Sequence, residues 1–227
     1  MHPVYVHIKK ELSPFYAEEE ASAMAKWISS DILHLSTLEL YTGKDMNFST
    51  KEWEELEDIL RRLKQREPLQ YILQEASFCG MSFHVEQGVL IPRPETEELV
   101  EWIVSDYREA GQVRILDIGT GSGCIPVSLA QLLPEAQVSS CDVSAEALRI
   151  AAMNVKRYGD KVTLFCADIL KEELPECQVD VLVSNPPYIT ESERTDMEAN
   201  VLDWEPELAL FVPDSDPLRF YRRIAWK

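Results

Sequence analysis

Residues 113–123 read VRILDIGTGSG, an apolar run that ends in three glycines spaced by single residues. Such a run, followed directly by the apolar stretch CIPVSLA, is typical of a buried strand that turns tightly into a helix. Glycine suits this turn because it adopts positive φ angles and lets a ligand approach the backbone. Glycines also occur in such turns for packing alone, so the triplet by itself leaves both interpretations open.

Strands and helices alternate from this stretch to residue 184. The predicted strands are residues 114–119, 136–142, 161–168 and 178–184, and the predicted helices are residues 124–133 and 145–158. This order predicts an α/β fold, with a parallel sheet covered by helices through right-handed crossovers. Ligands bind such sheets beyond the carboxyl ends of the strands, so the residues at those ends form the candidate site.

The first 75 residues are predicted to form a small helical domain. One helix is expected to start at Ser13 and Pro14, a short one to cover residues 36–41, and a longer one to run from Ser49 to Pro68. A glutamate three residues after Ser49 completes the capping-box pattern.

Over residues 76–92 the pattern of apolar residues changes from a helical period to a period of two residues. We expect a β-hairpin there, with a further short strand over residues 89–91, and interpret the segment as a connector between two domains. The larger domain then covers residues 93–227. Its first helix is predicted to begin at Pro94 and to run to about Tyr107.

The chain carries a formal net charge of −18. A surface of this sign repels polyanions, which disfavours duplex DNA or RNA as the substrate. One basic cluster stands out, and we interpret it as a solvated helix face: Arg61, Arg62, Lys64 and Arg66. No apolar run approaches the ~20 residues that cross a bilayer, and the first residues lack the apolar segment of a secretory signal. We therefore expect a cytoplasmic monomer with no membrane partner.

The cysteine pattern indicates neither a disulfide framework nor a zinc site. Five cysteines are scattered along the chain without a CxxC pair, at Cys79, Cys124, Cys141, Cys166 and Cys177. We interpret them as small buried hydrophobic residues, and we expect no bound metal.

Acidic residues lie at or near the ends of three successive predicted strands, at Asp117, Asp142 and Asp168. Asp142 follows the glycines by some 20 residues, where a carboxylate can bind both hydroxyls of an adenosine ribose. Asp142 could instead cap the next helix, but Ser144 already has that role. Asp168 is placed to face the adenine edge. A nucleoside is therefore the expected ligand.

The kind of nucleoside follows from what the glycine stretch lacks. It has no Walker lysine, and the diphosphate fingerprint G-x-G-x-x-G is absent. Acidic rather than basic neighbours suit a ligand without phosphates. S-adenosylmethionine fits, because its ribose is free and its sulfonium is cationic.

The fourth predicted strand ends in SNPPY, residues 184–188. Pro186 and Pro187 hold the backbone extended and offer no N–H donors. What remains is a pair of acceptors, the Asn185 side-chain oxygen and the Pro186 carbonyl, beside the Tyr188 ring. Two such acceptors can hold both hydrogens of a planar NH2 group and aim its nitrogen at a methyl donor. A proline-rich turn that merely ends a strand is the alternative.

Five stretches together resemble the peptide chain release factor glutamine methyltransferases, the PrmC/HemK family. They are REPLQYIL (66–73), GVLIPRPETEELVEWI (88–103), GTGSG (119–123), SNPPYI (184–189) and EPELAL (205–210). NPPY alone is shared with DNA adenine methyltransferases, whereas GVLIPRPETE is far more specific. The resemblance implies a Rossmann-like class I methyltransferase sheet, a small N-terminal helical domain that helps to recruit the release factor, and a connecting β-hairpin.

The resemblance also implies an activity. Family members transfer a methyl group from S-adenosylmethionine to the side-chain amide nitrogen of the glutamine in the GGQ motif of bacterial release factors 1 and 2. In this sequence the implied cofactor residues are Gly119, Thr120, Gly121, Ser122, Gly123, Asp142, Asp168, Ile169 and Asn185. The implied residues for the glutamine amide are Asn185, Pro186, Pro187 and Tyr188, of which Asn185, Pro186 and Tyr188 are the catalytic candidates.

Arg93 and Glu95, with Pro94 between them, are implied to shape the wall of the substrate site. A helix start packed under the hairpin is the alternative for these residues. The sequence departs from the family pattern at Gln74, Pro126 and Ile169. It also ends at Lys227, so we expect only four of the seven family strands, with an exposed edge on the fourth.

Two other functions remain open from the sequence. NPPY would also suit an adenine N-methyltransferase that acts on nucleic acid, although the acidic composition and the lack of a basic recognition segment oppose it. A non-catalytic adaptor that retains a nucleoside pocket is the second alternative.

Overall fold

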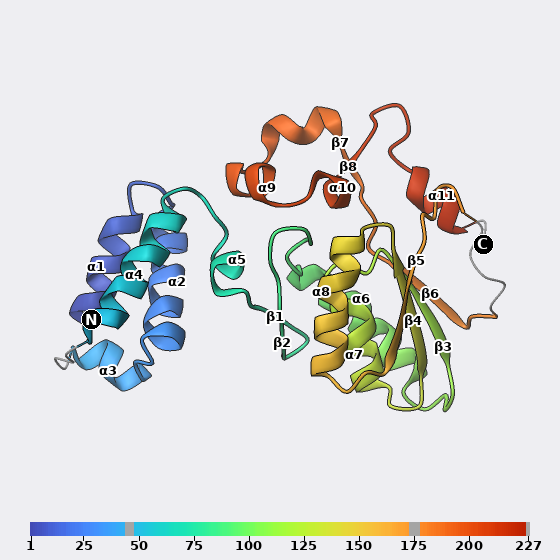
Figure 1. The fold of residues 1–227 in the computed structure, drawn as a ribbon, viewed down its shortest axis with the longest axis horizontal. Coiled ribbons are helices and arrows are strands. Elements are labelled where there is room, and N and C mark those ends of the chain that lie inside the picture. The colour runs from blue at the N-terminus through green and yellow to red at the C-terminus, as the bar shows by residue number, and fades with distance from the viewer. Residues whose placement is uncertain (44–47, 173–177, 226–227) are drawn as a thin grey trace. The chain divides into compact units, whose positions relative to one another are not determined.

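The computed structural model describes residues 1–43, 48–172 and 178–225 (Figure 1). The chain divides into two compact units, Met1–Ile72 and Leu73–Lys227. None of the helices in the described ranges is long and apolar enough to cross a membrane.

The first unit is helical. Its elements are α1 (Pro3–Leu12), α2 (Glu18–Trp27), the π-helix η1 (Ile28–Ile32), α3 (Thr37–Thr42) and α4 (Thr50–Leu63), and α5 (Leu69–Leu73) follows at its boundary. Fully buried apolar side chains from α1, η1 and α4 fill its interior, among them Ile8, Ile28 and Leu60. The predicted capping box at Ser49 is confirmed, because its hydroxyl accepts the Glu52 N–H while the Glu52 carboxylate accepts the Ser49 N–H.

Two predicted boundaries in this unit are wrong. Ser13 and Pro14 do not start a helix, because α1 ends there and the Ser13 N–H and hydroxyl both donate to the Lys9 carbonyl. The helix expected after Ser13 starts instead at Glu18, as α2. The sequence did not predict α1, which begins at Pro3, where a proline in the first turn forgoes no hydrogen bond. Likewise α4 ends at Leu63 rather than at Pro68, because Arg66 adopts a positive φ of 64° that no α-helix continues.

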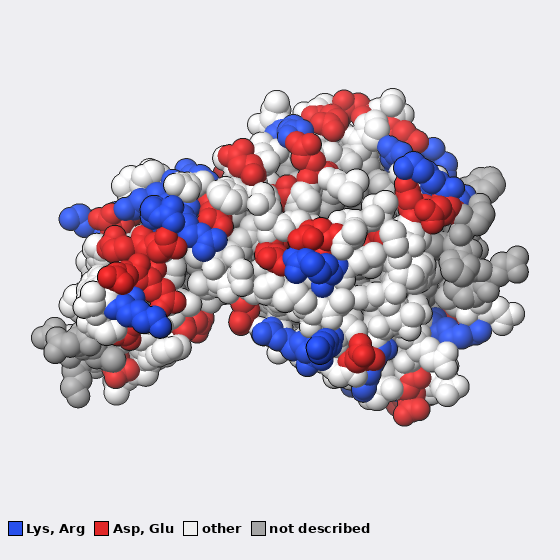
Figure 2. Space-filling view, in the orientation of Figure 1, with Lys and Arg blue, Asp and Glu red and all other residues white. Residues whose placement is uncertain are grey.

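The basic cluster on and after α4 is engaged by acids and an aromatic ring of the same unit. Arg62 pairs with Glu67, Lys64 with Glu11 and Arg61 with Asp58, and the Arg66 guanidinium lies 4.7 Å from the Tyr16 ring centroid. Figure 2 shows that basic and acidic side chains are interspersed over the face in view. This arrangement supports the interpretation of the cluster as a solvated helix face.

The second unit contains the predicted parallel sheet. Its strands are β3 (Arg114–Ile118), β4 (Gln137–Asp142), β5 (Val162–Cys166) and β6 (Val181–Ser184), in the order β5-β4-β3-β6 with every pair parallel. The helices α6 (Pro94–Tyr107), α7 (Cys124–Leu132) and α8 (Ala145–Arg157) alternate with them (Figure 1). The α/β prediction is confirmed, and β5 and β6 are the edges of the sheet in the described part of the chain.

Alternation along β3 divides the core of this unit between the two faces of the sheet. Ile115 packs with apolar residues of α6, α7 and α8, whereas Leu116 and Ile118 pack with Ile169 on the opposite face. The helix α11 (Arg219–Ala225) contributes Phe220 and Ile224 to this second cluster. The strand sequence therefore has to be apolar on both faces, as a covered parallel sheet requires.

The segment before α6 forms a hairpin of β1 (Ala76–Phe78) and β2 (Met81–Phe83). Phe78 and Phe83 are fully buried in the cluster that contains residues of α6 and α7, so the hairpin contributes to the core of the second unit. The predicted strand over residues 89–91 is wrong. Val89 and Ile91 are buried, which explains the alternation, but the Ile91 N–H donates to the Glu205 side chain instead of to a strand.

Residues 189–212 form small elements that the sequence did not predict. They are β7 (Ile189–Thr190), the 3₁₀-helix η2 (Glu191–Asp196), α9 (Ala199–Trp204), α10 (Glu207–Leu210) and β8 (Phe211–Val212). Strands β7 and β8 pair in parallel, so the residues after SNPPY lie beside the end of EPELAL.

The cysteine prediction is confirmed at two positions and wrong at one. Cys124 and Cys141 are buried, Cys79 is half-buried and Cys166, at the end of β5, is exposed. Cys177 lies outside the described residues. Within the described ranges, no three His, Cys, Asp or Glu side chains converge in a way that could hold a metal ion.

Candidate active site

The glycine loop, residues 119–123, turns from the end of β3 into α7. Gly119, Gly121 and Gly123 adopt positive φ angles of 82°, 53° and 82°, which explains why the sequence needs glycine there. The Gly119 N–H donates to the Cys141 carbonyl at 2.8 Å, and the Gly123 N–H donates to the Thr120 carbonyl at 2.8 Å. The loop is therefore held by its own backbone and by β4.

The three glycines differ in what surrounds them. A Cβ added at Gly123 would lie 3.2 Å from the Ala151 side chain on α8, so this glycine serves helix packing. A Cβ at Gly119 or Gly121 would meet nothing within 4 Å. Packing therefore explains one glycine of the triplet, while the other two border open space that a ligand can approach.

Asp142 lies at the end of β4 and binds the glycine loop. One carboxylate oxygen accepts the Gly121 N–H at 3.0 Å and the other accepts the Ser144 N–H at 2.9 Å. The Ser144 hydroxyl caps α8 by accepting the Ala147 N–H, as predicted. Asp142 thus connects the loop to the start of α8, and its half-buried carboxylate lies at the edge of the sheet where ligands bind.

Asp117 differs from the other two strand-end acids because it is completely buried. The Ser140 hydroxyl of β4 donates to its carboxylate at 2.5 Å. Burial raises the pKa of Asp117 to about 7, and the nearby Asp142 charge acts in the same direction. Asp117 therefore differs in position from Asp142 and Asp168, because its side chain lies in the interior of the domain.

Asp168 and Ile169 follow β5. The Asp168 carboxylate accepts the Leu170 N–H at 3.0 Å and pairs with the exposed Lys171 at 2.8 Å, and this hydrogen bond lowers the pKa of Asp168. Ile169 is 6% exposed and packs beneath the sheet edge in the cluster of Leu116 and Ile118. Both residues lie at the same carboxyl edge as Asp142, because Asp142 pairs with Cys166 in the sheet.

The SNPPY residues are placed beside the glycine loop by the sheet register. Ser184 pairs with Ile118 of β3, and its hydroxyl donates to the Ile118 carbonyl at 2.6 Å. Asn185 is half-buried, Pro186 is buried and Tyr188 is 56% exposed. The Asn185 amide donates to the hydroxyl of Thr96, at the start of α6, over 3.2 Å.

Most of the predicted substrate residues line one pocket of about 340 Å³. Its lining comprises Leu90, Arg93, Glu95, Thr96, Leu99, Asn185, Pro186, Tyr188, Ile189, Met197, Val201, Ala209 and Leu210. Five of the six predicted substrate residues are therefore together, and only Pro187 is not part of the lining. Among the described residues that line it, Asn185 alone also belongs to the predicted cofactor set.

The sequence prediction missed Thr96 and Glu205. Glu205 is buried, and its carboxylate pairs with Arg93 at 2.6 Å and accepts the Ile91 N–H at 3.1 Å. The only sequence signal was that both residues fall in the quoted stretches GVLIPRPETE and EPELAL. Nothing in either stretch indicates that the two meet, because they are joined through tertiary structure.

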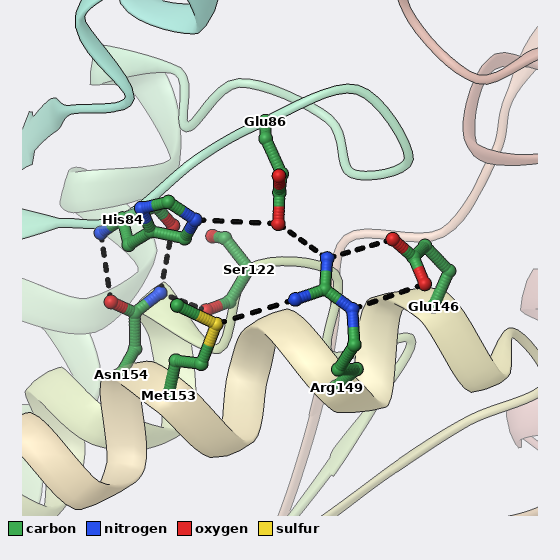
Figure 3. Close-up of polar contacts among 7 residues, drawn as sticks. All are labelled: His84, Glu86, Ser122, Glu146, Arg149, Met153 and Asn154. Atoms are coloured by element: carbon green, nitrogen blue, oxygen red, sulfur yellow. Dashed lines mark hydrogen bonds and ion pairs between the residues drawn. The ribbon is translucent and has the colours of Figure 1, made fainter.

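A second polar network supports the glycine loop from α8 (Figure 3). The buried Asn154 side chain donates to the Ser122 carbonyl at 2.8 Å and to the His84 carbonyl at 2.9 Å, and it accepts the His84 N–H at 2.8 Å. Next to it, Arg149 of α8 donates to both Glu86 and Glu146. The segment after the hairpin, α8 and the glycine loop are thus linked by one set of contacts.

Two protein families match the chain. The PrmC N-terminal domain matches residues 5–73, and the Methyltransferase small domain matches residues 96–203. Together they cover the helical unit and most of the unit that contains the sheet.

Curated relatives match over nearly the whole chain. The release factor glutamine methyltransferase of Bacteroides thetaiotaomicron is 51% identical over 226 residues, which cover 99% of this chain and 81% of the relative. That of Flavobacterium psychrophilum is 41% identical, with 94% of this chain and 76% of the relative covered. That of Streptococcus pneumoniae is also 41% identical, and the match covers 91% of this chain and 73% of the relative.

Solved structures support the fold. The hMettl16 catalytic domain, crystallised with a MAT2A 3′UTR hairpin, superposes with a TM-score of 0.51 over 80% of this chain and 64% of that chain. The two sequences are 17% identical, so this likeness concerns the fold alone.

Proposed function

The chain belongs to the family of release factor glutamine methyltransferases, and from this premise we propose that it methylates the glutamine of the GGQ motif in release factors 1 and 2. The methyl group would come from S-adenosylmethionine and go to the side-chain amide nitrogen. The observation that carries this proposal is the pocket that brings Asn185, Pro186 and Tyr188 together at the edge of the sheet, next to the glycine loop.

The acceptors of this pocket suit a primary amide. The Asn185 side-chain oxygen and the Pro186 carbonyl can each accept one of the two amide hydrogens, which fixes the plane of the amide and the direction of its nitrogen. As the nitrogen forms a new bond its hydrogens become better donors, so these contacts strengthen in the transition state. The buried Pro186 adds rigidity, because its ring fixes φ.

The other lining residues would hold the flanking peptide. The exposed Tyr188 ring can stack on the flat amide, and apolar residues of α6, α9 and α10 supply contact area. Glu95 is exposed at the first turn of α6 and would meet the backbone of the incoming loop. The Arg93 guanidinium is bound by Glu205, so we assign it to the wall of the pocket.

The residues around the glycine loop fit S-adenosylmethionine, which would supply an electrophilic methyl group on a sulfonium. Gly119 and Gly121 leave open space beside the backbone, as a closely approaching ligand requires. Asp142 can bind the ribose hydroxyls while it holds the Gly121 N–H. Asp168 and Ile169 follow the next strand and would border the adenine.

We propose that residues 1–75 form a domain that helps to recruit the release factor and that residues 93–227 form the domain that transfers the methyl group. Residues 76–92 would connect these two domains. This division rests on the family match to residues 5–73 and on the separate helical unit.

The test is methyl transfer with labelled S-adenosylmethionine to release factor 1 or 2. We expect label in the wild-type factor, on the GGQ glutamine by mass spectrometry, and none after that glutamine is replaced by alanine. Equal labelling of the replaced factor would refute the proposal. A DNA oligonucleotide serves as the second acceptor, and label in the oligonucleotide alone would favour an adenine methyltransferase.

A further inference from the structure

We propose that Arg223 is a positioning residue for the adenine of the cofactor, because it fixes the turn that carries Asp168 and Ile169. The proposal rests on the proposed function, which assigns these two residues to the border of the adenine. Arg223 belongs to α11, and its guanidinium makes two hydrogen bonds to the turn. Nε donates to the Ile169 carbonyl, 54 positions away, at 2.8 Å, and Nη2 donates to the Glu172 carbonyl at 3.0 Å.

The residues after β5 form a hydrogen-bonded turn around Asp168. The Asp168 carbonyl accepts the N–H groups of Lys171 and Glu172, at 3.0 and 2.8 Å. Its side chain takes part as well, because one carboxylate oxygen accepts the Leu170 N–H at 3.0 Å. The direction of the carboxylate therefore depends on the turn, and a change in the turn would move the acceptor that the adenine amino group would meet.

A single turn needs support from the rest of the structure. Closing one turn fixes several backbone torsions for few hydrogen bonds, so an isolated turn is rarely stable. The carbonyl groups at the end of a helical turn also have no partner within it. Arginine suits this task because its planar guanidinium carries five N–H donors and no acceptor. It can bind two carbonyl groups at once, and it binds them only as a donor.

The packing of α11 holds Arg223 in place. Phe220 and Ile224 of this helix pack on the apolar cluster that contains the Ile169 side chain. Arg223 is half-buried, so water competes less for its two contacts than it would at an exposed arginine. Ile169 is thus fixed twice, through its side chain in the apolar cluster and through its carbonyl on Arg223.

A turn that is already formed favours binding. If only a fraction of the molecules has the turn formed, the apparent affinity for the ligand falls by that fraction. Loss of the Arg223 contacts should reduce this fraction, and hence the affinity, by roughly 3- to 10-fold. Asp168 and Ile169 are not among the described residues that line the pocket of the proposed glutamine site, so the effect should concern the cofactor alone.

The first test is calorimetry with S-adenosylhomocysteine, the product that S-adenosylmethionine leaves after methyl transfer. Arg223→Met keeps the length of the side chain but removes every donor, so we expect its affinity to fall by roughly 3- to 10-fold. Arg223→Lys should lose less, because it keeps a cationic donor without the planar fork. The matched control is Arg222→Met, since Arg222 lies on the same helix, is 60% exposed and pairs with Asp216. We expect wild-type affinity from this control.

A second measurement asks whether the effect concerns the base. S-inosylhomocysteine carries an oxygen in place of the adenine amino group, and an ionised Asp168 accepts hydrogen bonds but donates none. Wild type should therefore prefer S-adenosylhomocysteine, and Arg223→Met should show a smaller preference. Equal affinity of wild type for both compounds would overturn the proposal. So would an Arg223→Met variant that is less stable but keeps the wild-type affinity and preference, because the contact would then serve stability alone.

A third readout needs neither cofactor nor release factor. Hydrogen exchange of the free protein reports on the N–H groups of Leu170, Lys171 and Glu172, which the turn protects. They should exchange roughly 3- to 10-fold faster in Arg223→Met than in wild type or Arg222→Met. Unchanged exchange in folded Arg223→Met would overturn the proposal.

If Arg223→Met fails to fold, Arg223→Gln replaces it under the same criteria, because glutamine is too short to reach both carbonyl groups. Absence of methyl transfer by wild type, together with the expected affinities and exchange, would refute the proposed function and leave the role of Arg223 standing.

Discussion

The guanidinium of Arg93 and the carboxylate of Glu205 form an ion pair of 2.6 Å between residues 112 positions apart in the sequence. The Glu205 side chain is 2% exposed, and its second oxygen accepts the Ile91 N–H. This glutamate therefore joins the segment before α6 to the segment between α9 and α10. Arg93 lines the pocket, as do Val201 of α9 and Ala209 of α10, so the pair connects two stretches of the chain that contribute to the lining.

Glu205→Gln should lower the free energy of unfolding by about 1–3 kcal/mol, because it leaves the Arg93 charge without its buried partner. Urea denaturation measures the loss. The matched control is Glu207→Gln, two residues later, where the carboxylate is 63% exposed and pairs with Arg194. An exposed pair of this kind contributes about 0–1 kcal/mol to stability. Equal losses in the two variants would therefore contradict a stabilising role of the Arg93–Glu205 pair.

Asn185→Ala should reduce methyl transfer by about 100-fold or more, because it removes one of the two acceptors that strengthen in the transition state. Single-turnover kinetics with a release factor would measure the effect. We expect the affinity for S-adenosylmethionine to change little, since the glycine loop and Asp142 remain intact. A comparable loss of cofactor affinity would show that Asn185 serves binding rather than transfer.

Gly119→Ala and Gly123→Ala should separate ligand approach from packing. Both place a side chain at a φ of 82°, a strain of roughly 1 kcal/mol or more. Only Gly123→Ala also presses against Ala151, so it should destabilise the fold more. Gly119→Ala should mainly weaken S-adenosylmethionine binding. Thermal unfolding measures the stability of both variants, and calorimetry measures their affinity for S-adenosylmethionine. Normal cofactor binding by Gly119→Ala would contradict a role of Gly119 in ligand approach.

Asn154→Ala should lower the free energy of unfolding by about 2–4 kcal/mol, because it leaves buried backbone groups of Ser122 and His84 without partners. It should also weaken cofactor binding, since the Ser122 carbonyl belongs to the glycine loop. The control is Asn200→Ala, because the half-buried Asn200 side chain accepts the N–H of the adjacent Val201. A loss below about 1 kcal/mol for Asn154→Ala would contradict the role given to this network.

The buried Asp117 should make stability depend on pH. Its pKa is raised from 3.8 to about 7 in the folded protein, so between these values the folded state keeps a proton that the unfolded state has lost. Unfolding then releases a proton, and the free energy of unfolding falls as the pH rises through this window. The contribution of the protonated Asp117 carboxyl to the free energy of unfolding is fully present below the unfolded pKa and is lost as the pH rises through about 7.

Asp117→Asn should remove this slope, which approaches about 1.4 kcal/mol per pH unit for one proton. Urea denaturation at several pH values between about 4 and 8 provides the measurement for both proteins. Parallel pH profiles of wild type and Asp117→Asn would show that another group is responsible.

Local patterns predicted much of the second unit well. The strands β3 to β6, the helices α6 to α8 and the Ser144 cap follow from apolar runs, a proline at a helix start and a serine before a helix. These features depend on residues within a few positions of one another, which sequence periodicity captures. The errors arose where a local pattern is compatible with two structures. Ser13 and Pro14 suit either the start or the end of a helix, and the alternating burial of residues 89–91 suits either a strand or a buried loop.

The sequence by itself determined the alternation of strands and helices, the glycine loop and the end of the fourth strand at SNPPY, because each depends on the backbone preferences of adjacent residues. Only the tertiary structure decided that Asp117 is buried, that Gly123 packs on α8, that Asn185 is bound by Thr96 and that Glu205 holds Arg93. These relationships join residues from 23 to 112 positions apart, as the Ser140–Asp117 and Arg93–Glu205 contacts show. Such pairs meet only after the sheet and its helices have packed, so no local pattern encodes them.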